Sequence, residues 1–205
     1  MPAIILASAS PSRKRLLEAA GINPTIVISN VYEEDSIYES MSPVEMVIAL
    51  AIVKAHTVRE IISEPGLIIA CDSTFEFEGA SLGKPLTSEV ARERSRRISG
   101  KSGLLHTGHC LIDTERGIEM SAVATTKVNF SELTELEIED YVASGEPLGV
   151  AGGFTLDGLS SAFISSIEGD YTNVIGLSIP LLRKMATELG YTWHDVTNQS
   201  DEVQQ

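Results

Sequence analysis

The sequence predicts a single α/β domain, and three observations carry that prediction. Short apolar runs without alternation, which are typical of strands buried on both faces of a sheet, alternate with segments that begin at helix-capping residues. The 205 residues are 43% hydrophobic, which is enough to bury a sizeable core. No internal repeat or low-complexity linker divides the chain. We therefore expect one domain over residues 1–196 and a polar tail over 197–205.

The chain begins with a short buried strand at Ile4–Ala7, a hydroxyl-bearing turn and a helix. Ser10 is a preferred N-cap, and Pro11 fits the first helical position because its missing N–H is harmless there. Gly21 is expected to end this helix as its C-terminal cap.

This first turn has the composition of an anion site. The free N–H groups at the helix start and the hydroxyls of Ser8 and Ser10 suit a phosphate, as do the cations Arg13, Lys14 and Arg15. Cations at a helix N-terminus are otherwise unfavourable. The alternative is an ordinary capped helix with a solvated basic face.

The later elements follow from capping and periodicity. Ser42 with Glu45, and Thr134 with Glu137, form capping boxes that start two helices, and Ser178 opens the last one. Further strands are expected at Pro24–Val31, Leu67–Cys71 continuing through Phe75–Phe77, Leu104–Asp113, Ile118–Phe130 and Ala162–Glu168, and helices at Pro43–Ile62, Ser88–Ile98, Thr134–Ala143 and Ile179–Leu189. The alternation of arginines and glutamates in Ser88–Ile98 predicts an exposed, ion-paired helix face.

Carboxylates follow two of the predicted strands. Asp72 comes directly after Leu67–Cys71, where open α/β sheets place their chemistry, although it could instead cap a turn. The second strand leads into Glu33, Glu34 and Asp35, which could bind a divalent cation through oxygen or form a solvated loop.

Two lysines occupy distinctive places. Lys54 lies near the middle of the helix that starts at Pro43, where a surface lysine with a buried stem is the simple interpretation. Lys84 stands between Gly83 and Pro85, and these neighbours restrain the backbone and so the direction of the amine.

Composition excludes several functions. The formal charge of −14 argues against a nucleic acid polymer or an anionic membrane as partner. Cys71 and Cys110 lie in apolar runs and indicate neither a disulfide framework nor a zinc site. His106 and His109 are three apart in a strand, so they point to opposite faces and cannot share an ion unless a bulge occurs at Gly108. The sequence shows neither a membrane span nor a signal peptide, and we expect a cytoplasmic protein.

Several separated stretches together match one family. They are Leu6–Pro11 with Arg13 and Lys14, the Glu33 loop, Lys54, Asp72 and Ser73, Leu82–Pro85, Tyr141–Pro147, Ala151–Phe154, and Ile167–Tyr171 with Asn173. In this order, over about Ile4 to Leu189, the sequence resembles the Maf-like nucleoside triphosphate pyrophosphatases, also known as septum formation inhibitor proteins.

The resemblance implies hydrolysis of a nucleoside triphosphate to a monophosphate and pyrophosphate with a divalent cation, Mg²⁺ or Mn²⁺. The substrates expected are non-canonical or selected canonical nucleotides. It also implies an elongated mixed sheet flanked by helices with a central cleft, similar to the fold of inosine triphosphate pyrophosphatases. A homodimer is the family expectation.

The resemblance also assigns roles. Asp72 matches the proton acceptor and, with Glu33, is expected to hold the cation. The residues expected to bind the phosphates are Ser8, Ser10, Arg13, Lys14, Lys54 and Lys84.

Three positions depart from the family pattern. Tyr32 replaces an aspartate before Glu33, and Ala70 stands where glycine is common. Asp157 falls where the pyrimidine-nucleotide subgroup has glutamine, and an ionised aspartate accepts hydrogen bonds without donating them. Asp157 is therefore the candidate for base specificity, and the base itself stays open.

Two other functions remain to be separated from hydrolysis to pyrophosphate. One is a nucleotide-binding regulator of septum formation with little or no turnover. The other is a phosphomonoesterase, which would release orthophosphate.

Overall fold

The computed structural model describes residues 2–31, 36–38 and 40–197, and these form one mixed sheet of seven strands. The strand order is β2-β1-β3-β5-β6-β7, and β4 pairs with β3 beside this path. Strand β1 is parallel to β2 and β3, and all other neighbours are antiparallel. The strands are β1 Ile4–Leu6, β2 Thr25–Ile26, β3 Leu67–Phe77, β4 Ala80–Leu82, β5 Ser102–Asp113, β6 Ile118–Phe130 and β7 Ile164–Glu168.

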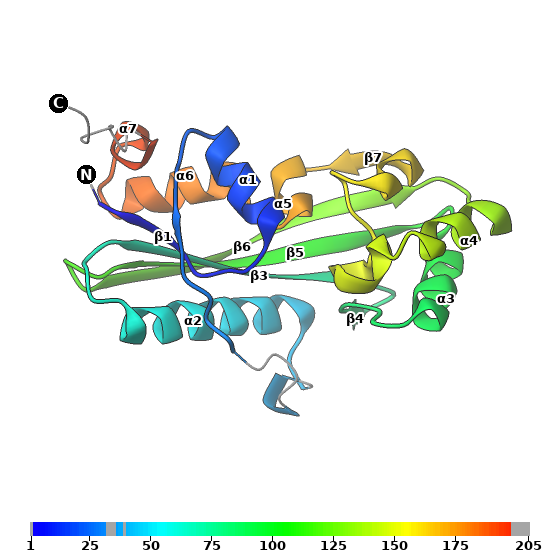
Figure 1. The fold of residues 1–205 in the computed structure, drawn as a ribbon, viewed down its shortest axis with the longest axis horizontal. Coiled ribbons are helices and arrows are strands. Elements are labelled where there is room, and N and C mark those ends of the chain that lie inside the picture. The colour runs from blue at the N-terminus through cyan, green and yellow to red at the C-terminus, as the bar shows by residue number, and fades with distance from the viewer. Residues whose placement is uncertain (1, 32–35, 39, 198–205) are drawn as a thin grey trace.

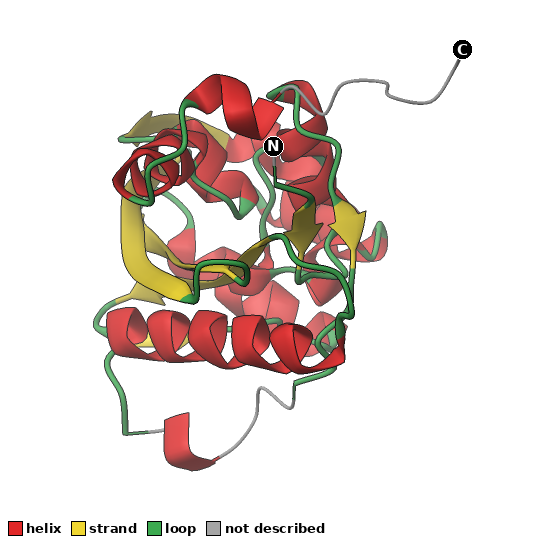
Figure 2. Ribbon diagram, turned by 90° about the vertical axis from the view of Figure 1, so that its left-hand side faces the viewer, coloured by secondary structure: helices red, strands yellow, loops and turns green. Residues whose placement is uncertain are grey.

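Helices cover both faces of this sheet, as Figure 1 shows. The helices are α1 Pro11–Ala19, α2 Pro43–Ile61, α3 Ser88–Ile98, α4 Glu135–Ala143, α5 Tyr171–Ile175, α6 Ile179–Glu188 and α7 Trp193–Thr197. Helix α2 runs along one face, whereas α1, α5 and α6 lie on the other, and the side view in Figure 2 keeps α2 on its own side of the strands. The long β5–β6 hairpin extends beyond the part of the sheet that α2 and α6 cover, to α3 and α4 at the far end of the molecule.

The alternation of side chains along β3 divides the core between the two faces. Ile69 and Cys71 pack with residues of α1 and α6, whereas Ile68 and Ala70 pack with residues of α2. Within the described residues, no helix combines the length and the apolar composition that a bilayer crossing requires.

The helix starts predicted from capping are confirmed. The Ser10 side chain accepts from the backbone N–H of Arg13, and the capping boxes begin at Ser42 and Thr134 as expected. Gly21 follows the first helix with a φ of 83°, a left-handed conformation that favours glycine. These contacts join residues within one helical turn, so local sequence is sufficient to predict them.

Other boundaries were wrong. The second strand covers only Thr25–Ile26 instead of Pro24–Val31, because its one neighbour β1 ends at Leu6 and then turns into α1. The last strand starts at Ile164 because a 3₁₀ turn occupies Leu159–Phe163. The short helices α5 and α7 were not predicted. Thr197, expected to begin the tail, is the last residue of α7, and residues 198–205 lie outside the described residues.

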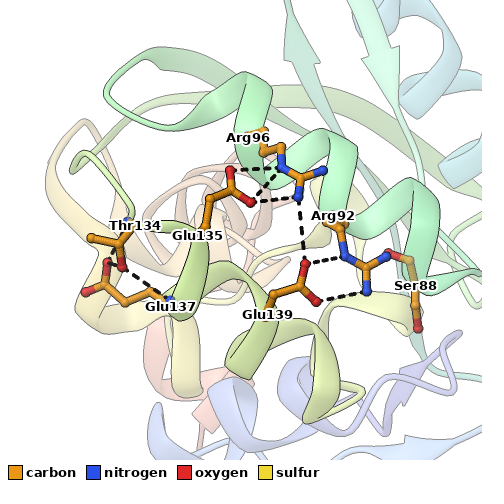
Figure 3. Close-up of polar contacts among 7 residues, drawn as sticks. All are labelled: Ser88, Arg92, Arg96, Thr134, Glu135, Glu137 and Glu139. Carbon is orange, nitrogen blue, oxygen red and sulfur yellow. Dashed lines mark hydrogen bonds and ion pairs between the residues drawn. The ribbon is translucent and has the colours of Figure 1, made fainter.

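The charged face of α3 is ion-paired as predicted, but the partners shown lie on another helix. Arg92 binds Glu139 and Arg96 binds Glu135, each with a closest distance of 2.6 Å, so the pairs join α3 to α4 (Figure 3). The sequence pattern within α3 suggested partners on the same helix. It could not reveal the pairs with α4, because the packing of α4 against α3 depends on tertiary structure.

Candidate active site

The candidate site lies where strand β3 loses its neighbours on one edge. Strand β1 pairs with β3 at Leu67–Ile69, and β4 pairs with it at Phe75–Phe77. Among the described residues no strand covers this edge between them, whereas β5 continues along the opposite edge. Asp72 lies in this gap. It is therefore inside a continuous strand and not at a strand end as predicted, and the carboxyl end that meets the site belongs to β1.

Asp72 forms a buried ion pair with Lys54 of α2. The Lys54 Nζ lies 2.5 Å from the Asp72 Oδ1, and the two residues are only 7% and 8% exposed. The interpretations of Asp72 as a turn cap and of Lys54 as a surface lysine are both wrong. Each charge compensates the desolvation of the other, and the pair fixes the orientation of the carboxylate.

Helix α2 can approach Asp72 closely because β5, the strand paired with β3 there, has a glycine without a side chain at this point. Gly108 of β5 is opposite Asp72 in register, and a Cβ there would lie 2.2 Å from the carbonyl oxygen of Val47. Only glycine permits this approach. Lys54 shares the buried stripe of α2 with Val47, Ala51 and Ala55, which directs its ammonium into the sheet.

Arg13 binds beside Asp72 from the other face of the sheet. Its Nε donates to the Gly176 carbonyl at 2.7 Å, its Nη1 to the Ser8 hydroxyl at 3.2 Å, and its Nη2 to the Ser73 hydroxyl at 3.0 Å. A guanidinium has five N–H donors, so two remain for a ligand. The guanidinium is thus held in a fixed orientation next to the strand that carries Asp72.

Ser8 is poised to donate to an anion. Its oxygen accepts both the Arg13 guanidinium and the backbone N–H of Ser10 at 3.2 Å. These contacts use the lone pairs of the hydroxyl and leave its hydrogen to donate. With the N–H groups of the first turn of α1, Ser8 offers hydrogen-bond donors to a phosphate.

Two other predicted phosphate ligands, Lys14 and Lys84, are exposed. Lys14 pairs with Glu18 on the exposed face of α1 at 3.4 Å, so the structure does not bring it to Asp72. Lys84 is exposed in the segment after β4. That segment is held at the Gly83 carbonyl, which accepts from Arg94 at 2.5 Å.

The remaining site predictions fall at the margin. Asp157 lies beside α1, where its Oδ2 accepts from Ser12 at 3.1 Å and from Arg15 at 3.0 Å. Glu33 lies outside the described residues. Among the residues that are described, no group of three or more His, Cys, Asp or Glu side chains could hold a metal ion.

Three buried side chains, Cys71, His106 and His109, are not nucleophiles or shared ligands. Burial raises the pKa of the Cys71 thiol to about 12, so it stays protonated. His106 contacts Glu76 and Thr125, whereas His109 contacts Thr107 and Ser178, so the two rings have separate surroundings.

Sequence reasoning named Ser8 but missed the other two partners that hold Arg13, Ser73 and the Gly176 carbonyl. Ser73 adjoins Asp72 and had the only visible signal, a hydroxyl next to a strand carboxylate. The Gly176 carbonyl is 163 positions from Arg13, and no local pattern points to it.

The fold and this cluster define an α/β protein with a fixed cluster of hydrogen-bond donors beside a buried, ion-paired carboxylate. The family model described as Maf-like protein matches residues 3–189, so the chain belongs to the Maf-like family.

Several relatives bear the name nucleoside triphosphate pyrophosphatase. One from Streptomyces coelicolor is 48% identical over 91% of this chain and 90% of its own length. One from Thermosynechococcus vestitus is 45% identical over 97% of this chain and 100% of its own. A solved structure of a nucleoside-triphosphatase/dITP/XTP pyrophosphatase from Mycobacterium abscessus aligns over 96% of this chain and 99% of its own length, at 13% identity and a TM-score of 0.42.

Proposed function

We infer that this chain is a nucleoside triphosphate pyrophosphatase, an enzyme that hydrolyses a nucleoside triphosphate to a monophosphate and pyrophosphate. Relatives at 44–48% identity bear that name. The structural observation that carries the assignment is the juxtaposition of the Asp72–Lys54 pair with Arg13 at the start of α1. This arrangement places a fixed carboxylate next to donors for phosphate oxygens.

We propose the following roles at the reacting bond. Asp72 orients the attacking water and accepts its proton, and Lys54 holds the carboxylate in position. Arg13 and the Ser8 hydroxyl bind the phosphate oxygens and stabilise the charge that develops on them. Lys84 and the Ser10 turn complete the phosphate contacts. Lys14 would have to leave Glu18 to join them.

A divalent cation is part of the proposal. The Asp72 carboxylate has the hard oxygen ligands that Mg²⁺ and Mn²⁺ prefer, and Glu33 is proposed as the second ligand. When bound, the cation neutralises phosphate charge. This suits a chain whose formal charge of −14 would repel a bare triphosphate.

We propose that the enzyme acts in the cytoplasm on non-canonical or selected canonical nucleotides. Its two free cysteines are compatible with a reducing compartment. Asp157, an acceptor when ionised, is proposed to contact the base. We keep a homodimer as part of the proposal, and size-exclusion chromatography with light scattering would test it.

The decisive experiment is a triphosphate panel with Mg²⁺ or Mn²⁺ and with a chelator. Monophosphate and pyrophosphate should appear together, and the chelator should stop their release. Orthophosphate as the first product would indicate a phosphomonoesterase, and binding without turnover would favour the septum-formation regulator.

The role of Asp72 is tested in the same assay. Asp72→Asn keeps the size of the side chain but removes the base, so turnover of every triphosphate should fall at least about a thousandfold. Glu188→Gln, an exposed change on α6 whose pair with Lys184 is 3.9 Å long, is the control. Full activity in Asp72→Asn, with an unchanged circular dichroism spectrum, would refute the assignment.

A further inference from the structure

Arg13 belongs to a closed ring of hydrogen bonds that passes through two residues with no contact to the phosphate site. Its Nη2 donates to Ser73, and the Ser73 hydroxyl lies 2.9 Å from the hydroxyl of Thr107. Thr107 donates to the backbone carbonyl of Asn173 at 3.2 Å. The same carbonyl accepts from the N–H of Gly176, whose own carbonyl accepts the Arg13 Nε. The ring therefore connects α1, β3, β5 and α5.

Arg13 and the backbone carbonyls together fix the direction of every hydrogen bond in this ring. Arg13 can only donate, and a backbone carbonyl can only accept. Thr107 therefore uses its single hydroxyl hydrogen on Asn173, and it must accept the hydrogen of Ser73. Ser73 in turn has only lone pairs to offer Arg13. Each hydroxyl has one orientation, so the guanidinium meets a fixed acceptor.

The ring is also buried and anchored at its far side. Thr107 and Asn173 are fully buried. The Asn173 side-chain amide donates to the Leu105 carbonyl and to the Thr126 hydroxyl, each at 3.1 Å. Gly176 packs against the ring, since a Cβ there would lie 3.4 Å from the Arg13 Nε. The acceptor that ends the chain of hydroxyls thus has a fixed position.

We propose that Thr107 is a positioning residue for phosphate binding: through Ser73 and the Asn173 carbonyl it holds the Arg13 guanidinium in its binding orientation. This inference rests on the proposed function. Ser73 and Thr107 are directly opposite in the β3–β5 register, so the strand pairing itself places the hydroxyls together. Without the Thr107 hydroxyl, the hydrogen of the Ser73 hydroxyl loses its acceptor. The Ser73 hydroxyl can then rotate toward the gap, so it no longer presents a fixed lone pair to Arg13.

The test is Thr107→Val, which keeps the shape and removes the hydroxyl. The KM for the triphosphate should rise about tenfold, the equivalent of one hydrogen bond to a charged group, while kcat changes less than about threefold. Thr107→Ser restores the hydroxyl and should recover most of the affinity. An unchanged KM in Thr107→Val would overturn the proposal.

Thr172→Val is the matched control for a purely structural effect. Thr172 is also buried, and its hydroxyl supports the same helix by donating to the Asp170 carboxylate at 2.8 Å and accepting the N–H of Ile179 at 3.0 Å, but this hydroxyl lies outside the ring. Its melting temperature should fall about as much as that of Thr107→Val, with KM retained. Equal losses of affinity in both variants would show that looser α5 packing, and not the ring, is the cause.

A double variant tests whether Thr107 acts through Ser73. In a Ser73→Ala background, Thr107→Val should change KM less than about twofold, because the hydroxyl that transmits its effect is already absent. Independent, multiplying effects would contradict the proposal. A wild-type protein that releases no pyrophosphate would refute the proposed function instead, so the two failures are distinguishable.

Discussion

His109 makes the stability of this protein sensitive to mild acid. The ring is fully buried and bridges two backbone segments: its Nδ1 lies 3.0 Å from the Thr107 carbonyl, and its Nε2 accepts the N–H of Ser178 at 2.9 Å. These roles require the neutral tautomer with hydrogen on Nδ1. Protonation would place a second N–H against the N–H of Ser178.

Burial lowers the pKa of His109 from 6.5 to about 4, and the positive charge of Arg13 adds to this effect. The backbone contact with Thr107 and the charge of Asp170 act in the opposite direction. When the pH is above 6.5, the pKa of His109 in the unfolded chain, His109 is neutral in both the folded and the unfolded protein. As the pH falls from about 6.5 to 4, only the unfolded chain takes up the proton, so stability falls with the pH.

This linkage predicts a loss of about 2 kcal/mol between about pH 7.5 and pH 5, and of about 3 kcal/mol when the pH is below both pKa values. The assay is urea unfolding across this range, comparing the wild type with His109→Gln, whose amide oxygen can still accept from Ser178. Carboxylates titrate in both proteins, so the difference between the two curves isolates His109. Parallel curves would refute the reasoning.

Three further outcomes follow from the contacts. Lys54→Met should abolish turnover and lower the free energy of unfolding by about 3 kcal/mol, because it leaves the Asp72 carboxylate unpaired. Chemical denaturation should show that adding Asp72→Asn to Lys54→Met regains part of that stability. Glu146 accepts from the Thr155 hydroxyl and the Leu159 N–H and so holds the loop that carries Asp157, the proposed base contact. Glu146→Gln weakens these bonds, so the ratios of kcat/KM among bases should change by more than about threefold in a substrate panel. Arg96→Gln should lower stability by less than about 1 kcal/mol by urea unfolding, because its pair with Glu135 is exposed, and a larger loss would contradict this assessment.

The elements that the sequence predicted well depend on contacts close in the chain. The caps at Ser10, Ser42 and Thr134 each bind a group three positions ahead, and the β5–β6 hairpin closes at a short turn. The predictions were wrong where the length of an element depends on the strand that pairs with it. The second strand stops at Ile26 because β1 is short, which no property of residues 27–31 reveals.

The residue types of the site could be predicted from sequence, but their pairing could not. Ser8, Arg13, Lys54 and Asp72 were all named from motifs, and the structure brings them to one gap in the sheet. Lys14 looked equivalent to Arg13 in sequence. The helical turn separates them, so that one cation enters the site and the other pairs with Glu18.

The sequence by itself determined the α/β class, the helix starts, the family and the chemical groups available for phosphate hydrolysis, because capping, periodicity and residue type are properties of short segments. Only the tertiary structure decided that Lys54 serves Asp72 and that Thr107 lies in the ring that holds Arg13. Those contacts depend on the order of strands in the sheet and on how closely α2 approaches Gly108, and both arise when segments distant in the chain pack together.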